Sequence, residues 1–537
     1  MDAESDGKAS EQTSRGLYKA GVFVLGFLVA LFIAGFDSFG LDTAGDLRTS
    51  EWQSTLVAPL THANPGKGDA LIRTLAGRTP VQQARYAKAQ AAVTVLLVDA
   101  KARDKLDFDT PYLPYALQAQ YLDAILKAHP KAVFFDFIYR RHHGTGASNM
   151  AGPEDDAKDL AALVQVLKDN KNKKYGTPVP VYVGPVDDRP ELAEFRTLVT
   201  PVSVSWRGND VATYPFVGDD QYNPDGEMPR PALTAAATIY QQLCPKEATP
   251  ADLDCRLADQ ISVTAPKRLP PLFMTYDRYA GVDKRYLATP DCVAEKTSAR
   301  RNGPSGLGAV LADNLMRRAA PTASTKCLPV PYFSLADAAA VHAAAFFTPD
   351  DAFLKDEVTG KVVMIGDDLG NDLYDAPAFG QIDGVFQHAV ALQHLLADGR
   401  DYTRWPQPVE MQLGQGTFSV RVNFFVEWLI SLAAAVIAQY WLTVRNRPSK
   451  QRGEGWVLAG RLATIFAGTF LVSLAIAALQ TFWFHWPPNN SPGVLLSTVT
   501  LIGGMEFDRL SSKYRLILGG AGAVLAILSC LWLYSLL

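Results

Sequence analysis

The chain has 537 residues, of which 48% are hydrophobic and 20% are charged, and its formal net charge is −4. A charge so close to neutral, with no basic stretch interleaved with aromatic residues, excludes a nucleic-acid-binding protein. The length allows three or four domains of roughly 150 residues. Because the apolar residues are concentrated near both ends, a wholly soluble protein is excluded too.

The first apolar segment is residues 20–37, which follows a short N-terminus of residues 1–19. Its uncharged run AGVFVLGFLVALFIAGF is long enough to cross roughly 30 Å of hydrocarbon. A cleaved signal peptide is the alternative. However, the run exceeds the usual apolar region of about 7–15 residues, and no small-residue cleavage site follows it. We therefore predict an uncleaved membrane anchor.

Four more apolar segments lie toward the C-terminus, and we expect each to span the membrane. They are residues 424–444, 456–484, 492–507 and 516–537. The segment 492–507 is short and ends beside Glu506 and Asp508, so a re-entrant hairpin is its alternative. Whether it crosses the membrane decides on which side the C-terminus lies.

Basic residues predict the orientation of these spans. Lys and Arg occur before the first span, in the loop 445–455 and in the loop before the last span, whereas the link 485–490 has neither. The positive-inside rule places the basic segments in the cytoplasm, so residues 38–423 are expected to be exported. The basic residues are Arg15, Lys19, Arg445, Arg447, Lys450, Arg452, Arg509, Lys513 and Arg515.

The cysteines agree with export of the middle region. Cys244, Cys255, Cys292 and Cys327 all lie there, and Cys530 lies in the last predicted span. An even number of exported cysteines suits an oxidising compartment. Pairing between sequence neighbours gives Cys244–Cys255 and Cys292–Cys327, and two other connectivities stay open. Zinc binding is the rival interpretation, but the spacings contain no C-x-x-C and no histidine lies nearby.

Short β-branched runs alternate with helical stretches along the exported region. The continuous apolar run at residues 93–98 is typical of a strand covered on both faces of its sheet. The alternation predicts an α/β fold, with a mostly parallel sheet and helices on both faces. The expected strands are 93–98, 132–137, 179–183, 272–275 and 361–365, and the expected helices are 115–128, 155–167, 334–344 and 384–396. Residues 244–267 and 291–327 fit this pattern less well and are expected to be disulfide-tied insertions.

Several segments, taken in their order and spacing over most of residues 90–400, resemble the CHASE2 family. The most specific is GKVVMIGDDLGNDLYDAPAFGQIDGVFQHAVALQHLL at residues 360–396. The others are LLVDA at 96–100, KAVFFDFIY at 131–139, VATYPFV at 211–217, PRPALTAAATIY at 229–240 and PYFSLADA at 331–338. The resemblance implies an extracytoplasmic sensor domain of a bacterial signalling receptor, and hence a multi-pass protein of the bacterial inner membrane with its large domain in the periplasm.

The chain departs from the family pattern in its expected cytoplasmic parts. Family members commonly carry a kinase, a nucleotide cyclase or a diguanylate cyclase after the spans. Here the expected cytoplasmic pieces, 1–19, 445–455 and 508–515, total roughly 40 residues, far fewer than the roughly 100–200 of a catalytic domain. We therefore expect the signal to pass through the membrane helices to a separate protein.

Five aspartates are the candidate ligand-binding residues. Asp99 and Asp136 end the first two predicted strands, and Asp367, Asp372 and Asp375 lie in the loop after the strand 361–365. Ligands of open α/β sheets bind outside the carboxyl ends of strands, which favours a small-ligand site there. Calcium is the alternative for the crowded loop. Because the EF-hand spacing is absent and aspartates commonly serve turns and caps, we expect no metal and no cofactor.

The sequence offers no catalytic motif. It contains no nucleophile elbow, no phosphate-binding loop and no zinc-binding helix of the HExxH type, so we expect a protein that is not an enzyme. The predicted function is a membrane-anchored sensor or receptor subunit, and the alternative is a structural scaffold of an envelope or membrane complex. The expected partners are the lipid bilayer, an unknown output or assembly protein, an unknown periplasmic ligand and a second copy of the chain.

Overall fold

The computed structural model describes residues 85, 88–106, 113–139, 153–204, 213–219, 231–244, 254–262, 269–274, 330, 332–335, 354–368, 373–376, 380–404, 409–413 and 416–420. The chain divides into two compact units. One is Ser54–Trp405, and the other combines Met1–Gln53 with Pro406–Leu537. In the second unit the described residues form an antiparallel hairpin of β13 (Val409–Leu413) and β14 (Gly416–Val420).

A six-stranded sheet forms the centre of the unit Ser54–Trp405. Its strand order is β4-β3-β2-β10-β1-β9, and every neighbouring pair is parallel. The strands are β1 (Val93–Val98), β2 (Ala132–Phe135), β3 (Val181–Val183), β4 (Thr200–Pro201), β9 (Tyr332–Ser334) and β10 (Val362–Asp367). This arrangement confirms the predicted α/β core with a parallel sheet.

Both faces of the sheet are buried, which explains why its central strands are apolar without interruption. In β1 the residues alternate between the two hydrophobic cores, with Val93, Val95 and Leu97 in one and Leu96 and Val98 in the other. Since successive side chains of a strand point to opposite faces, such a strand needs an apolar residue at nearly every position.

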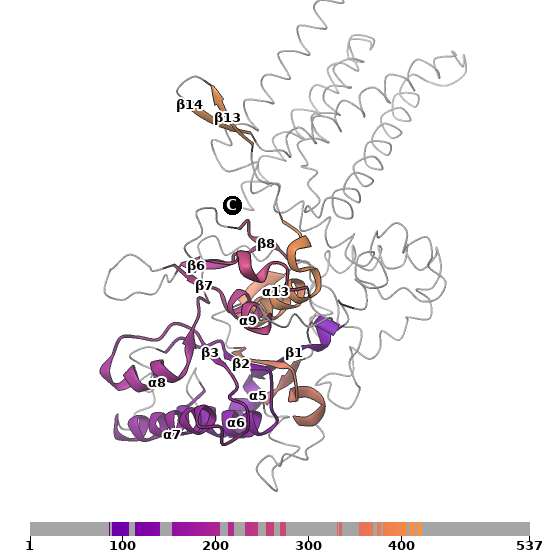
Figure 1. Ribbon diagram of the computed structural model, residues 1–537. Coiled ribbons are helices and arrows are strands. Elements are labelled where there is room, and N and C mark those ends of the chain that lie inside the picture. Colours follow the sequence, from indigo (N-terminus) through magenta and orange to yellow (C-terminus); the bar gives the residue numbers. More distant parts are fainter. Residues whose placement is uncertain are drawn as a thin grey trace, which may run out of the picture. The chain divides into compact units, whose positions relative to one another are not determined.

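Helices cover both faces of this sheet, as the sequence pattern predicts (Figure 1). The helices α9 and α13 contribute to the core on one face, and α5, α6, α7 and α8 contribute to the core on the other. Their bounds are α5 (Ala100–Leu106), α6 (Tyr115–Lys127), α7 (Pro153–Lys171), α8 (Ala193–Leu198), α9 (Ala235–Leu243) and α13 (Gly384–Asp398). In α13 every residue from Gly384 to Ala397 is buried, so the helix is enclosed on all sides.

Short elements complete the described part of the unit. Three antiparallel pairs are β5 (Thr213–Tyr214) with β8 (Leu272–Phe273), β6 (Val217–Asp219) with β7 (Pro231–Leu233), and β11 (Leu373–Ala376) with β12 (Gly380–Asp383). The short helical turns are η1 (Pro190–Leu192), η2 (Ala258–Gln260), the π-helical η5 (Leu354–Val358) and η6 (Gly399–Asp401).

Two predicted elements differ from the structure. The strand expected at 272–275 is the two-residue β8, which pairs with β5 rather than with the parallel sheet, and the backbone N–H of Phe273 donates to Thr403. The strand β9 was not expected, because only three residues form it. Ser334, the predicted start of a helix, is the last residue of β9, and the helix expected beyond Leu335 lies outside the described residues.

Within the described ranges, no helix combines the length and the apolar character needed to cross a membrane. The five segments predicted to do so, 20–37, 424–444, 456–484, 492–507 and 516–537, all lie outside those ranges. Their membrane role therefore stays a prediction.

Candidate functional site

Three of the predicted aspartates lie at the ends of three neighbouring strands. Asp99 follows β1, Asp136 follows β2, and Asp367 is the last residue of β10. Since β10 lies between β1 and β2, the carboxyl ends of these strands form one continuous part of the sheet edge. We call the carboxyl ends of β1, β2 and β10 the strand edge. We call Asp99, Asp136, Asp367, Asp368 and Asp383 the edge aspartates.

The strand order changes direction at this edge. From β1 the chain continues through β2, β3 and β4 toward one side of the sheet, whereas β9 lies on the other side of β1. The later strand β10 then fills the position between β1 and β2. A reversal of this kind separates the connecting segments of neighbouring strands, which is why ligands of open α/β sheets commonly bind there.

Asp99 is held in place by two hydrogen bonds to one of its carboxylate oxygens. Its Oδ1 accepts from the backbone N–H of Ala102, at 2.8 Å, and from the hydroxyl of Ser334, at 2.7 Å. The first bond caps the start of α5, where an aspartate satisfies an otherwise unpaired N–H. The second bond ties β1 to the end of β9, so Asp99 has a structural role in addition to its place at the edge.

Asp136 lies beside a buried histidine that the sequence pattern does not single out as functional. Its Oδ1 is 3.7 Å from His388 Nε2, and both side chains are at least nine-tenths buried. On the other side of the imidazole, Nδ1 is 2.6 Å from the hydroxyl of Tyr214, which accepts the N–H of Ala236. In the tautomer that carries its proton on Nε2, Tyr214 donates to His388 Nδ1 and the Nε2 proton faces Asp136.

The environment of His388 keeps the imidazole neutral. Burial lowers its pKa to about 3, although the nearby carboxylate of Asp136 favours the protonated form. The rings of Phe134 and Tyr214 pack edge-on against it, with centroid distances of 5.3 and 5.5 Å. His388 is thus an uncharged neighbour of Asp136 rather than an ion-pair partner.

The remaining edge aspartates concentrate negative charge near the start of α13. Asp383 directly precedes that helix and is 6% exposed. The pKa of Asp368 is raised, first because burial disfavours its charged form and then because of the charge of Asp99. A hydrogen bond with Asp383 and the charge of Arg103 act in the opposite direction. A group of carboxylates in which one has a raised pKa suits a cationic or hydrogen-bond-donating ligand.

A glycine allows the start of α13 to approach the edge so closely. A Cβ atom on Gly366 of β10 would lie 2.6 Å from Val385 Cγ1, well inside van der Waals contact. Gly366 therefore has no side chain because the first turn of α13 occupies that space. The position of Asp383 and His388 over the strand ends depends on this contact.

The structure does not test whether the side chains of two predicted site residues, Asp372 and Asp375, belong to this group. Asp375 lies in β11, and its backbone pairs with Gln381 of β12. Asp372 lies outside the described residues. In the described part of the chain, no group of three or more histidine, cysteine, aspartate or glutamate residues has the arrangement to hold a metal ion. The calcium alternative for the loop after β10 stays untested, because residues 369–372 lie outside the described ranges.

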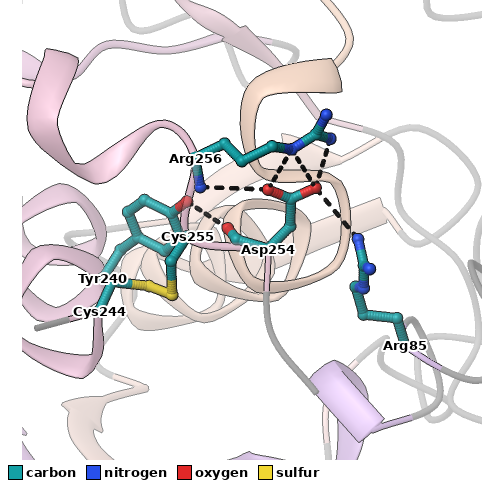
Figure 2. Close-up of a disulfide and its surroundings, with 6 residues drawn as sticks. All are labelled: Arg85, Tyr240, Cys244, Asp254, Cys255 and Arg256. Atoms are coloured by element: carbon teal, nitrogen blue, oxygen red, sulfur yellow. Dashed lines mark hydrogen bonds and ion pairs between the residues drawn. A yellow bond between two sulfur atoms is a disulfide. The ribbon is translucent and has the colours of Figure 1, made fainter. Parts of the chain in front are cut away.

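A second buried polar group surrounds a disulfide bond (Figure 2). Cys244 and Cys255 are bonded, which is one of the two bonds given by pairing sequence neighbours. Cys292 and Cys327 lie outside the described residues. Next to the bond, the carboxylate of Asp254 is held by Arg85 and Arg256. The sequence analysis identified the cysteines but not these charged residues.

The comparison with protein families agrees with this architecture. Residues 69–434 match the CHASE2 domain, and because this is more than half of the chain, the protein belongs to the CHASE2 family. CHASE2 domains are extracellular sensor domains, not catalytic ones, and they occur in the extracytoplasmic parts of membrane sensor proteins. No curated protein and no solved structure matches the chain significantly.

Proposed function

We propose that the protein is a non-enzymatic, membrane-anchored sensor or receptor subunit of the bacterial inner membrane. Its CHASE2 domain lies in the periplasm and binds a ligand or an envelope partner. The event is passed through the membrane helices to a separate protein. The observation that carries the proposal is the CHASE2 match over residues 69–434.

The edge aspartates support a recognition role for one part of this domain. Asp99, Asp136 and Asp367 come from strands that are far apart in the sequence, yet they lie at adjacent strand ends. Buried carboxylates cost free energy, so a fold that gathers several of them at the carboxyl ends of neighbouring strands marks a candidate functional site. We propose that this edge receives the positively charged or donor group of the ligand or partner.

The proposed receptor passes on a signal by changing its conformation. A ligand shifts such a receptor only by binding one conformation more tightly than the other. The proposal therefore requires two states of the domain that the membrane helices distinguish.

The experiment that tests the proposal is purification of the tagged full-length protein in mild detergent, with mass spectrometry of the proteins that stay bound. We expect a kinase, a cyclase or another signalling subunit in the eluate. Envelope or structural proteins alone would favour a scaffold instead. If the protein came out alone, a stable output partner would be ruled out.

A matched pair of variants locates the binding surface. Asp136→Asn removes a charge at the strand edge, and Asp169→Asn removes one from α7, where Asp169 pairs with Lys174. If a partner binds the edge, only Asp136→Asn should reduce its recovery. Equal recovery with both variants would place the partner elsewhere.

A further inference from the structure

The carboxylate of Asp254 is almost completely buried, with 3% of its side chain exposed, and two arginines compensate its charge. Arg85 Nη1 lies 3.0 Å from Oδ2. Arg256 bonds in a fork, with Nε 2.9 Å from Oδ1 and Nη2 2.5 Å from Oδ2 (Figure 2). Forked contacts of this kind fix geometry as well as charge, because the planar guanidinium matches the carboxylate.

The position of this carboxylate explains why it needs both arginines. The N–H of Asp254 donates to Leu396 O, at 3.3 Å, and Gly399 packs directly against the side chain. Both residues belong to the C-terminal end of α13, where the helix dipole disfavours negative charge. A Cβ atom on Gly399 would lie 2.6 Å from Asp254 Cβ, so the fit leaves no room for a side chain.

The two arginines connect Asp254 to two segments that are far apart in the sequence of the unit Ser54–Trp405. Arg85 precedes β1, in what we call the incoming segment (residues 85–92). Arg256 also binds Asp401, with Nη2 2.5 Å from Oδ2. Asp401 lies in the outgoing segment (residues 399–404), which ends just before the unit does at Trp405. One buried carboxylate therefore connects both segments.

The disulfide holds this carboxylate at the end of α9. Cys255 follows Asp254 directly and is bonded to Cys244, which ends α9. The hydroxyl of Tyr240, also from α9, donates to the backbone carbonyl of Asp254. The bond therefore limits how far Asp254 can move from the arginines.

We propose that Arg85, Asp254, Arg256 and Asp401 form a clamp that couples the incoming and outgoing segments, and that the Cys244–Cys255 bond keeps the clamp closed. The coupling is a property of the domain itself and needs no ligand. Only its use to transmit a signal rests on the proposed function.

The test is hydrogen–deuterium exchange with mass spectrometry on the full-length protein in detergent. Arg85→Gln should raise the exchange of peptides from the outgoing segment about threefold or more, because Asp254 loses one of the two cations that hold it there. Asp401→Asn should produce the reciprocal change in the incoming segment. The matched control is Lys174→Gln, which breaks an exposed ion pair with Asp169 on α7 and should leave both segments unchanged.

The proposal is overturned if Arg85→Gln changes exchange only around position 85 and Asp401→Asn only around position 401. Asp401 is 45% exposed, so its variant keeps the test usable if Arg85→Gln unfolds the protein. Neither result depends on recovery of an output protein, so failure of the clamp and failure of the proposed function are distinguishable.

The role of the disulfide has its own test. A dithiol reductant transfers two electrons and two protons to the Cys244–Cys255 bond, which leaves two thiols, and the reagent becomes a cyclic disulfide. Replacing Cys244 and Cys255 by serine should raise exchange in both segments as much as reduction does. Replacing Cys292 and Cys327 by serine is the control. Unchanged exchange in the Cys244–Cys255 variant would show that the clamp does not need the bond.

Discussion

The two buried polar regions of the domain handle negative charge in opposite ways. At the clamp, one carboxylate is matched by two guanidinium groups, and the hydrogen bonds to Asp254 and Asp401 raise the pKa of Arg256. At the strand edge several carboxylates lie at neighbouring strand ends, and the pKa of Asp368 is raised by burial and by the charge of Asp99.

This difference separates a stabilising contact from a candidate binding site. A fully paired carboxylate offers a ligand little, because the protein already supplies its partners. The raised pKa of Asp368 means that its charged form costs free energy, which a ligand could recover by contributing charge or donors. The edge aspartates, rather than the clamp, are therefore the region in which to look for recognition.

The largest expected effect is at the glycine that shapes the strand edge. Gly366→Ala should destabilise the domain by about 3 kcal/mol, because the added methyl group overlaps the side chain of Val385. Thermal unfolding of the full-length protein measures this loss. The control is Gly360→Ala, where φ is +69° but no atom lies within 4 Å of the new Cβ, and a loss of about 1 kcal/mol is expected. Equal losses would show that the strand edge is not tightly packed.

The next effect is at the clamp. Asp254→Asn keeps the size of the side chain but removes the counter-charge of Arg85 and leaves Arg256 with Asp401 alone, so we expect a loss of about 2 kcal/mol. Chemical denaturation at neutral pH measures it. Asp169→Asn, at an exposed pair, should have no measurable effect. A clamp variant as stable as this control would mean that the arginines contribute nothing to stability.

The strands and helices with strong patterns could be predicted from the sequence. Apolar runs predict the strands β1 and β10, and helical spacing predicts the helices α6 and α13. The predicted bounds lie within a few residues of the observed ones. The disulfide between Cys244 and Cys255 was also predictable, because its cysteines are only 11 positions apart.

The features that could not be predicted depend on which segments of the chain lie next to one another in the fold. Nothing in the sequence of β10 indicates that it lies between β1 and β2, because an apolar strand could pair with any other apolar strand of the sheet. The contact of Tyr214 with His388 joins residues 174 positions apart, and that of Ser334 with Asp99 joins residues 235 apart. Placing Asp99, Asp136 and Asp367 at strand ends was possible from the sequence, but the neutral histidine beside Asp136 was not.

The buried histidine makes the strand edge sensitive to acid. The pKa of His388 is about 3 in the folded domain and about 6.5 when unfolded, so the unfolded state binds the proton first as the pH falls. Stability should therefore be lost below about pH 6.5, by about 1–2 kcal/mol between pH 7.5 and pH 5.

His388→Gln should flatten that part of the pH profile in thermal unfolding. Between pH 7.5 and 8.5, above the unfolded pKa, the wild-type and variant curves should run parallel, and this range is the internal control. If the variant lost stability as steeply as the wild type below pH 6.5, another group would be responsible.

The smallest effect is expected at Asp368. The direction of its stability change tests the difference between the strand edge and the clamp. Because the pKa of Asp368 is raised in the fold, its ionisation costs free energy as the pH rises above about 3.8, the ordinary value. Asp368→Asn removes that cost, so stability at pH 7 should stay unchanged or rise by less than about 1 kcal/mol.

Arg103→Gln should act in the opposite direction, since Arg103 favours the charged form. Chemical denaturation of both variants beside Asp254→Asn measures these changes. If Asp368→Asn lost as much stability as Asp254→Asn, both regions would be stabilising contacts, and the strand edge would have no surplus of charge to offer a ligand.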